Sequence, residues 1–275
     1  MRNRCSLLTL LLGCNQIYGL DKTQPIDAAY FDAPPATCPA LGTPPVFGQD
    51  FQQVVFQPCS DYTLSSSGRA LARCNRVISE GPIGGALVGA VGLEQTADLT
   101  YDHPRLHPDG QSVVVRMIDR TVPRTSFGVF ARTDAGWGKT SEFSVPYQML
   151  GSSTPSRDNH VLVVASGGGL RELADDGAGT WNEVLVHDFA ELGITSLGDQ
   201  VDLSADGLRL IFIGTAIGKS SVNLLYADRA AETERFSTAT PMPSVEYLPN
   251  GFLTEDCGRL YFSGLGTVFY VESVR

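Results

Sequence analysis

The chain has 275 residues, of which 43% are hydrophobic and 18% are charged, with a net charge of −10. This length suits one all-β domain, and this composition excludes a disordered chain. Nucleic-acid binding is not expected, because the charge is acidic and no run of Lys and Arg occurs.

The first residues have the pattern of a secretory signal. Arg2 and Arg4 form a short positive region, and an apolar run rich in leucine follows between Leu7 and Leu12. The run is too short to span a bilayer, so we interpret it as an export signal rather than a transmembrane helix.

The signal ends in Leu11-Leu12-Gly13-Cys14, which resembles the bacterial lipobox. The resemblance implies that residues 1–14 are a lipoprotein signal peptide and that Cys14 carries the lipid and becomes the mature N-terminus. Asn15 follows in place of Asp, which is similar to the outer-membrane sorting signal, so the implied location is the outer membrane of the cell envelope, facing the periplasm or the surface. An ordinary cleaved signal and a misassigned start codon are the alternatives.

Residues 15–45 are expected to be a tether. Prolines at 25, 34, 35, 39, 44 and 45 disfavour a helix, and no apolar periodicity is present. The folded body is expected over residues 46–275.

A short motif recurs along this body: a polar stretch, a turn residue and an apolar strand. The turn residues are Gly68, Gly110, Asn159, Gly207 and Gly258, which are spaced 42, 49, 48 and 51 residues apart. Such turns need a residue that tolerates positive φ, and Asn is the best substitute for Gly. A period of this length with several strands per unit is typical of a β-propeller.

The motif resembles the TolB-like, WD-type propeller repeats of exported bacterial proteins, most clearly at Asp109-Gly110, Asp206-Gly207 and residues 256–262. The predicted fold is therefore an all-β propeller of about five four-stranded blades, with six blades or a β-sandwich as alternatives. The last blade lacks an outer strand, and we expect the stretch 46–56 to supply it and so remove an open edge.

Four cysteines remain after the signal and the lipidated residue: Cys38, Cys59, Cys74 and Cys257. They allow three pairings. In a propeller, Cys59 and Cys74 fall on the same rim of the first blade, and Cys257 lies on the rim at which the closing strand enters. We therefore predict Cys59–Cys74 and Cys38–Cys257. Free cysteines and a zinc site without C-x-x-C spacing are the alternatives.

The histidines suggest no metal site. His103 and His107 are four apart, but Pro104 and Pro108 disfavour a helix, so both are interpreted as loop residues before a turn. His160 and His187 are isolated in the sequence. No metal and no cofactor is expected.

Four acids precede the predicted inner strands: Asp61, Asp102, Asp199 and Glu246. One hypothesis places them at the mouth of a central channel, where five-bladed glycosidases carry catalytic acids. The other treats them as polar residues on exposed loops.

The function expected from the sequence is a membrane-anchored scaffold that binds an envelope protein or a glycan, without catalysis. The alternative is a propeller-type glycoside hydrolase or another carbohydrate-active enzyme that uses the four acids.

Overall fold

The computed structural model describes residues 38–55, 58–121, 124–144, 149–155, 160–165, 169–178, 180–204, 206–243, 251–254, 256–264 and 266–274. Every regular element within these ranges is a β-strand. In the same ranges there is no helix with the length and apolarity needed to cross a bilayer.

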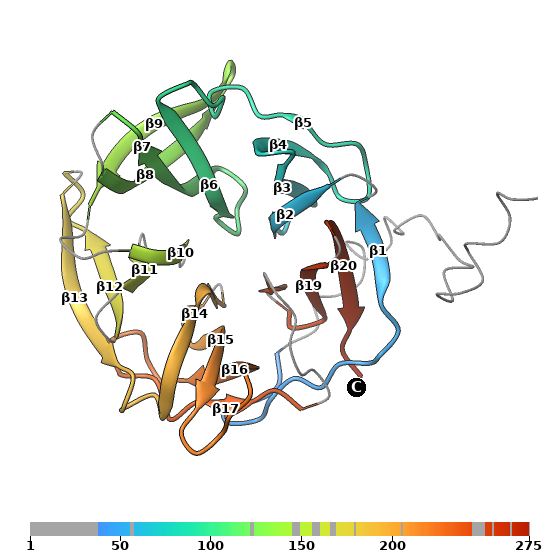
Figure 1. The fold of residues 1–275 in the computed structure, drawn as a ribbon, viewed down its shortest axis with the longest axis vertical. Helices are drawn as coiled ribbons and strands as arrows, with labels where there is room; N and C mark the ends of the chain where they lie inside the picture. The colour runs from blue at the N-terminus through green and yellow to red at the C-terminus, as the bar shows by residue number, and fades with distance from the viewer. Residues whose placement is uncertain are drawn as a thin grey trace, which may run out of the picture.

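The strands form five antiparallel four-stranded sheets placed around one axis in a propeller-like arrangement (Figure 1). We number the sheets as blades in chain order. Blade 1 contains β2 (Cys59–Leu64), β3 (Arg69–Cys74), β4 (Val77–Pro82) and β5 (Val88–Gly89). Blade 2 contains β6 (Leu99–Leu106), β7 (Ser112–Asp119), β8 (Arg124–Thr133) and β9 (Gly136–Phe143). Blade 3 contains β10 (Met149–Pro155), β11 (His160–Ala165), β12 (Gly169–Asp175) and β13 (Trp181–Asp188). Blade 4 contains β14 (Ile194–Leu203), β15 (Arg209–Ala216), β16 (Asn223–Asp228) and β17 (Thr240–Pro241). Blade 5 contains β18 (Phe252–Leu253), β19 (Arg259–Gly264), β20 (Thr267–Glu272) and β1 (Gln52–Val55). The predicted all-β, propeller-like arrangement is confirmed.

The turn between the first and second strands has the same geometry in blades 1, 2 and 4. The corresponding turn of blade 3, with the predicted turn residue Asn159, lies outside the described residues. Gly68, Gly110 and Gly207 have φ values of 76°, 72° and 71°. In blade 5 the left-handed residue is Cys257, with φ 54°, so the expectation that Gly258 has this role is wrong. The Cys257 amide donates to the Thr254 carbonyl at 2.8 Å, as the Gly207 amide does to Ser204, so the turn itself is preserved.

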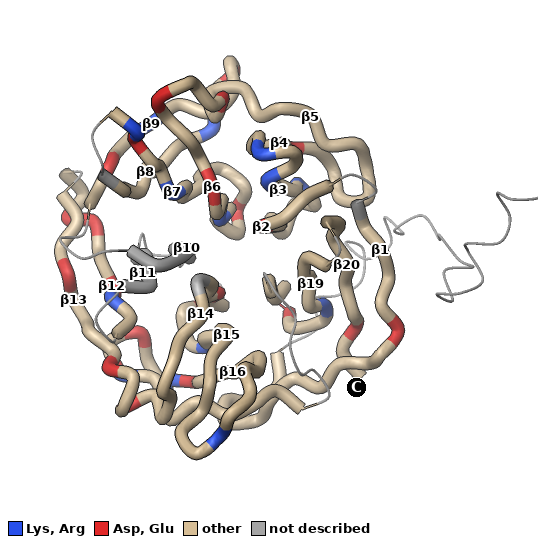
Figure 2. Tube along the Cα trace, in the orientation of Figure 1, with Lys and Arg blue, Asp and Glu red and all other residues tan. Residues whose placement is uncertain are grey.

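The hydrophobic core lies between the faces of neighbouring blades. Leu71 and Ile78 of blade 1, for example, pack with Val113, Val115 and Trp137 of blade 2, and all five are buried. Burying a side chain of this size contributes about 1.5–3 kcal/mol to the free energy of unfolding. The blades are therefore held together mainly by apolar contact. Acidic and basic residues are interspersed around the ring (Figure 2).

The chain closes the ring by pairing its N-terminal strand with its C-terminal one. β1 lies antiparallel to β20, with Gln52 opposite Tyr270, and the Tyr270 hydroxyl donates to Gln52 Oε1 at 2.6 Å. An isolated bridge between Phe47 and Ser273 extends this contact, and Phe47 is buried. The prediction that the stretch near residue 50 completes the last blade is confirmed.

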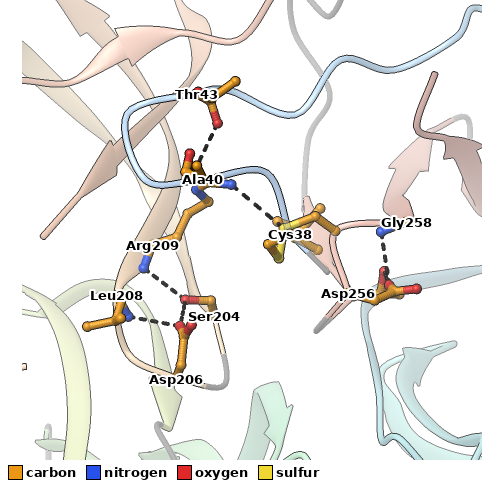
Figure 3. Close-up of a disulfide and its surroundings, with 12 residues drawn as sticks. Cys38, Ala40, Thr43, Ser204, Asp206, Leu208, Arg209, Asp256 and Gly258 are labelled. Carbon is orange, nitrogen blue, oxygen red and sulfur yellow. Dashed lines mark hydrogen bonds between the residues drawn. A yellow bond between two sulfur atoms is a disulfide. The ribbon is translucent and has the colours of Figure 1, made fainter. Parts of the chain in front are cut away.

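Both predicted disulfides are present, Cys59–Cys74 within blade 1 and Cys38–Cys257 between the N-terminal segment and blade 5. Figure 3 shows the second of these beside the turn that carries Asp256 and Gly258.

Residues 38–45 pack against the propeller. Arg209 Nη2 donates to the carbonyl oxygens of Ala40 and Thr43 at 3.4 and 3.0 Å, and the Gly42 amide donates to Asp228 Oδ2 at 2.6 Å. Residues 38–45, which were predicted to belong to the tether, thus contact the propeller. Residues 1–37, with the signal, Cys14 and the rest of the predicted tether, lie outside the described residues.

Candidate functional site

The inner strands of blades 1, 2 and 4 each contain a β-bulge. The pairing register shifts between Ser60 and Thr63 in β2, between Asp102 and Arg105 in β6, and between Leu197 and Val201 in β14. A bulge turns a side chain away from the regular alternation of the strand and is frequent next to functional sites. These bulges carry Asp61, His103 and Gln200.

Two of the bulge residues have an unusual backbone. Asp61 has φ 52° and His103 has φ 46°, in the left-handed region that few residues other than glycine adopt. His103 lies inside β6, so its interpretation as a loop residue is wrong. Asp61, Asp102 and Asp199 likewise lie within β2, β6 and β14 rather than before them.

The three bulge side chains meet at the Asp61 carboxylate. His103 Nδ1 lies 3.0 Å from Asp61 Oδ1, and Gln200 Nε2 donates to the same oxygen at 3.4 Å. The Ser60 hydroxyl donates to Asp61 Oδ2 at 3.1 Å. Asp61, His103 and Gln200 are all buried, so one carboxylate joins the inner strands of three blades away from water.

The environment of Asp61 keeps this carboxylate ionised. Burial alone would raise its pKa, but the hydrogen bond and charge of His103, the charge of Arg105 and the Ser60 hydroxyl outweigh burial and lower the pKa to about 2.

Arg105 completes the group, which we call the axial cluster: Asp61, His103, Arg105 and Gln200. The Arg105 side chain is 1% exposed, and its Nε, Nη1 and Nη2 atoms have no hydrogen-bond partner among the described residues. Arg105 and Gln200 were not identified from the sequence. For Gln200 the available signal was its position relative to the repeated turn, since Asp61, His103 and Gln200 each stand three residues before the end of their inner strand.

The other predicted acids do not join this cluster within the described part of the chain. Asp102 accepts two hydrogen bonds from Arg116, from Nε to Oδ1 at 2.7 Å and from Nη2 to Oδ2 at 2.9 Å. Asp199 lies in β14, and its side chain is outside the described residues. Glu246 lies wholly outside them.

A second buried charged group lies between blades 3 and 4, and it includes His187, which was expected to be isolated. His187 Nε2 lies 3.3 Å from Glu172 Oε2, and Arg229 contacts both oxygens of Glu172. Burial tends to raise the pKa of Glu172, but hydrogen bonds from His187 and Arg229 and their charges bring it down to about 2. All three side chains are satisfied by each other, so we assign this group to inter-blade packing.

The described residues contain no group of three or more His, Cys, Asp and Glu side chains placed to hold a metal ion. The axial cluster instead combines one carboxylate, one imidazole, one amide and one guanidinium that lacks a hydrogen-bond acceptor in the described part of the chain. Because the Asp61 carboxylate stays ionised, it is not set up to donate a proton as a general acid.

No family model and no curated protein sequence matches the chain. Among solved structures, a gluconolactonase from Xanthomonas campestris has a TM-score of 0.50 and 13% identity, covering 78% of this chain and 71% of that one. TolB from Acinetobacter baumannii has a TM-score of 0.46 and 11% identity, covering 80% of this chain and 55% of TolB. A functionally unknown protein from Desulfotomaculum acetoxidans has a TM-score of 0.42 and 12% identity, covering 79% and 70%. At this identity the likeness to the gluconolactonase shows a β-propeller fold and nothing of the activity.

Proposed function

We propose that this chain is an exported, lipid-anchored binding scaffold, in which the propeller presents its loops to an envelope protein or a glycan. The proposal has two parts, the location and the role, and each has its own support and test.

The two disulfides support the location. Disulfides form and persist in oxidising compartments outside the cytoplasm, and the four cysteines of the body are all paired with each other. The lipobox resemblance at Cys14 adds a lipid anchor at the N-terminal end of the segment that reaches the propeller at Cys38. Acyl chains bind a bilayer through about 0.8 kcal/mol for each buried methylene.

The ionisation of Asp61 and the pairing of Asp102 with Arg116 support a binding role. A glycosidase needs one carboxyl group with a raised pKa to protonate the leaving group, and a second ionised carboxylate nearby. The pKa of Asp61 is lowered to about 2 instead of raised. Both carboxylate oxygens of Asp102 accept hydrogen bonds from Arg116. Neither is set up as a general acid, so we favour binding over the glycoside hydrolase alternative.

Metabolic labelling with a radioactive fatty acid tests the anchor. We expect label on the wild-type protein and none on C14S, which should move from the membrane to the soluble fraction. C5S is the matched control, because Cys5 lies within the signal and should leave labelling unchanged. Label that persists on C14S, or wild type without label, contradicts the anchor.

Capture followed by binding in purified form tests the scaffold. The protein is cross-linked in its native envelope, partners are identified by mass spectrometry, and each candidate is purified and titrated against the chain. Saturable binding of a purified protein or glycan supports the role. Turnover of a panel of chromogenic glycosides, abolished in D61N, would instead establish the hydrolase alternative.

A further inference from the structure

The two disulfides of the propeller differ in their surroundings. Cys59 and Cys74 stand opposite each other in the ladder between β2 and β3, and each is 4% exposed. Cys38 lies in the segment ahead of β1 and is only partly buried, whereas its partner Cys257 is 2% exposed. Of these four cysteines, Cys38 is therefore the one most open to a reagent that approaches the folded protein.

Arg209 is placed to favour the departure of Cys257 when the bond between the two sulfurs breaks. Its Nη1 donates to Cys257 Sγ at 3.8 Å, while Nε and Nη2 donate to the carboxylate of Asp228. The pairing with Asp228 thus fixes the guanidinium with one N–H aimed at the sulfur. Asp256 precedes Cys257 in the chain, but its carboxylate accepts from the Gly258 amide. A charged N–H donor stabilises the negative charge that a leaving sulfur acquires.

Access and leaving ability together set the direction of thiol–disulfide exchange. The reaction is faster when the attacked sulfur is accessible and when the leaving sulfur carries negative charge easily. Cys38 meets the first condition, and Cys257, beside Arg209, meets the second. Attack on Cys59 or Cys74 requires blade 1 to open first, because both are buried within it.

We propose that Cys38–Cys257 is a thiol-exchange site for an external dithiol of the kind that thiol oxidoreductases carry. A thiolate of the dithiol attacks Cys38 Sγ, the bond to Cys257 breaks, and its electron pair passes to Cys257 Sγ. The second thiolate then attacks the dithiol's own sulfur in the mixed disulfide and releases Cys38. The dithiol is oxidised to a disulfide by two electrons, and its two protons end on Cys38 and Cys257.

Opening this disulfide removes the covalent attachment of residues 38–45 to blade 5. Leu41 is the one large apolar residue between Pro39 and Thr43, and it is 47% exposed. The remaining polar attachment is the Gly42 amide on Asp228 and the donation from Arg209 to two backbone carbonyls. Ordering a stretch of this length has a large entropic cost, so reduction should free it. The ring stays closed, because β1 keeps its pairing with β20.

Release of these eight residues changes the reach of the chain ahead of the propeller. An extended residue spans about 3.3–3.6 Å, so the freed stretch adds up to roughly 26–29 Å. For a propeller held by an acyl chain, this would set its distance from the membrane. That consequence rests on the proposed lipid anchor, whereas the exchange reaction does not.

A trapping experiment on the purified, oxidised chain tests the site. Any free thiols are first blocked with iodoacetamide. The folded protein is then mixed with a thioredoxin variant that retains only its attacking cysteine, so that the mixed disulfide accumulates. New thiols are blocked with N-ethylmaleimide after unfolding, and mass spectrometry of tryptic and chymotryptic peptides locates both labels. The same reaction in urea, where both disulfides are exposed, is the reference.

We expect the mixed disulfide on Cys38 and the maleimide on Cys257, formed at least tenfold faster than any product of Cys59–Cys74. In urea the two rates should converge. The double variant C38S/C257S, which keeps only Cys59–Cys74, is the matched control and should form no adduct over the same time while folded. After reduction of wild type with dithiothreitol, hydrogen exchange should increase in peptides that cover residues 39–46 and stay unchanged in β1.

Three results would overturn the proposal. The first is a folded protein that resists the trap at Cys38 although it reacts in urea. The second is an adduct on Cys257, or on Cys59 or Cys74 at a rate equal to that at Cys38. The third is a reduced protein whose residues 39–46 exchange hydrogen as slowly as before. None of these results depends on whether Cys14 carries a lipid.

Discussion

Arg229 donates from Nη1 and Nη2 to the two carboxylate oxygens of Glu172, at 2.9 and 3.0 Å, and so joins blade 4 to blade 3. Both side chains are buried, and the Phe236 ring lies 4.5 Å from the Arg229 guanidinium carbon. Removing one member of such a pair leaves the other charge buried and unpaired.

Glu172→Gln is therefore expected to lower the free energy of unfolding by about 3–5 kcal/mol. Glu183→Gln is the matched control: Glu183 contacts Arg171 at 3.3 Å in a partly exposed pair, and its loss should cost less than about 1 kcal/mol. Equilibrium unfolding in urea measures both. Equal effects of the two substitutions would show that the buried pair adds nothing beyond an exposed one.

Acid should destabilise the protein through Glu172. Its pKa in the folded protein is about 2, below the usual 4.5, so the folded state binds its proton less readily than the unfolded chain. This contribution is fully present above pH 4.5 and is lost as the pH falls toward 2. We expect the free energy of unfolding of wild type to fall more steeply over this range than that of Glu172→Gln. Parallel curves for the two proteins would contradict this assignment.

The two disulfides should differ in their contribution to stability. Cys38–Cys257 spans 219 residues and Cys59–Cys74 spans 15, and a longer loop restricts the unfolded chain more. Replacing Cys38 and Cys257 by serine should cost about 2 kcal/mol more than replacing Cys59 and Cys74, by loop-closure entropy. Denaturant unfolding of the two double variants measures this, and the reverse order would contradict it.

Removal of the closing strand should expose an edge. A chain that lacks residues 15–55 leaves β20 without its partner β1, and an unpaired strand edge promotes association. We expect oligomers or aggregates in size-exclusion chromatography with light scattering. A chain that lacks only residues 15–37, and the double serine variant of Cys38 and Cys257, should remain monomeric because both keep β1. Monomeric behaviour of the shorter chain would contradict the role of β1.

The sequence predicted those parts of the fold that depend on local rules. The turn at Asp206-Gly207 needs positive φ, and the strands after it are apolar, so their identity follows from a short window. The disulfide pairing followed once a ring closed by the N-terminal strand was assumed. Gly258 was chosen over Cys257 because glycine tolerates positive φ at no cost, yet the turn hydrogen bond from the Cys257 amide to Thr254 places the left-handed residue one position earlier.

The site depended on contacts that the sequence does not contain. His103 stands beside Pro104 and so resembled a loop residue, whereas a bulge in the pairing of β6 with β7 turns it toward Asp61. Arg105 looked like an ordinary strand residue, because its lack of an acceptor depends on the next blade. Residues 38–45 have few apolar side chains, but their backbone groups contact Arg209 and Asp228, and backbone partners leave no trace in composition.

The placement of β1 in the last blade has a consequence for biogenesis. Ribosomes deliver the N-terminus first, so the segment from Cys38 to Val55 emerges long before the strand and the cysteine with which it pairs. Until residue 272 is available, β1 lacks its partner strand β20, and Cys38 is exposed to the wrong partners Cys59 and Cys74. Maturation of this chain therefore has a late, all-or-none step, in which the earliest and the latest parts of the polypeptide meet, and an oxidoreductase that reshuffles premature pairings should speed it.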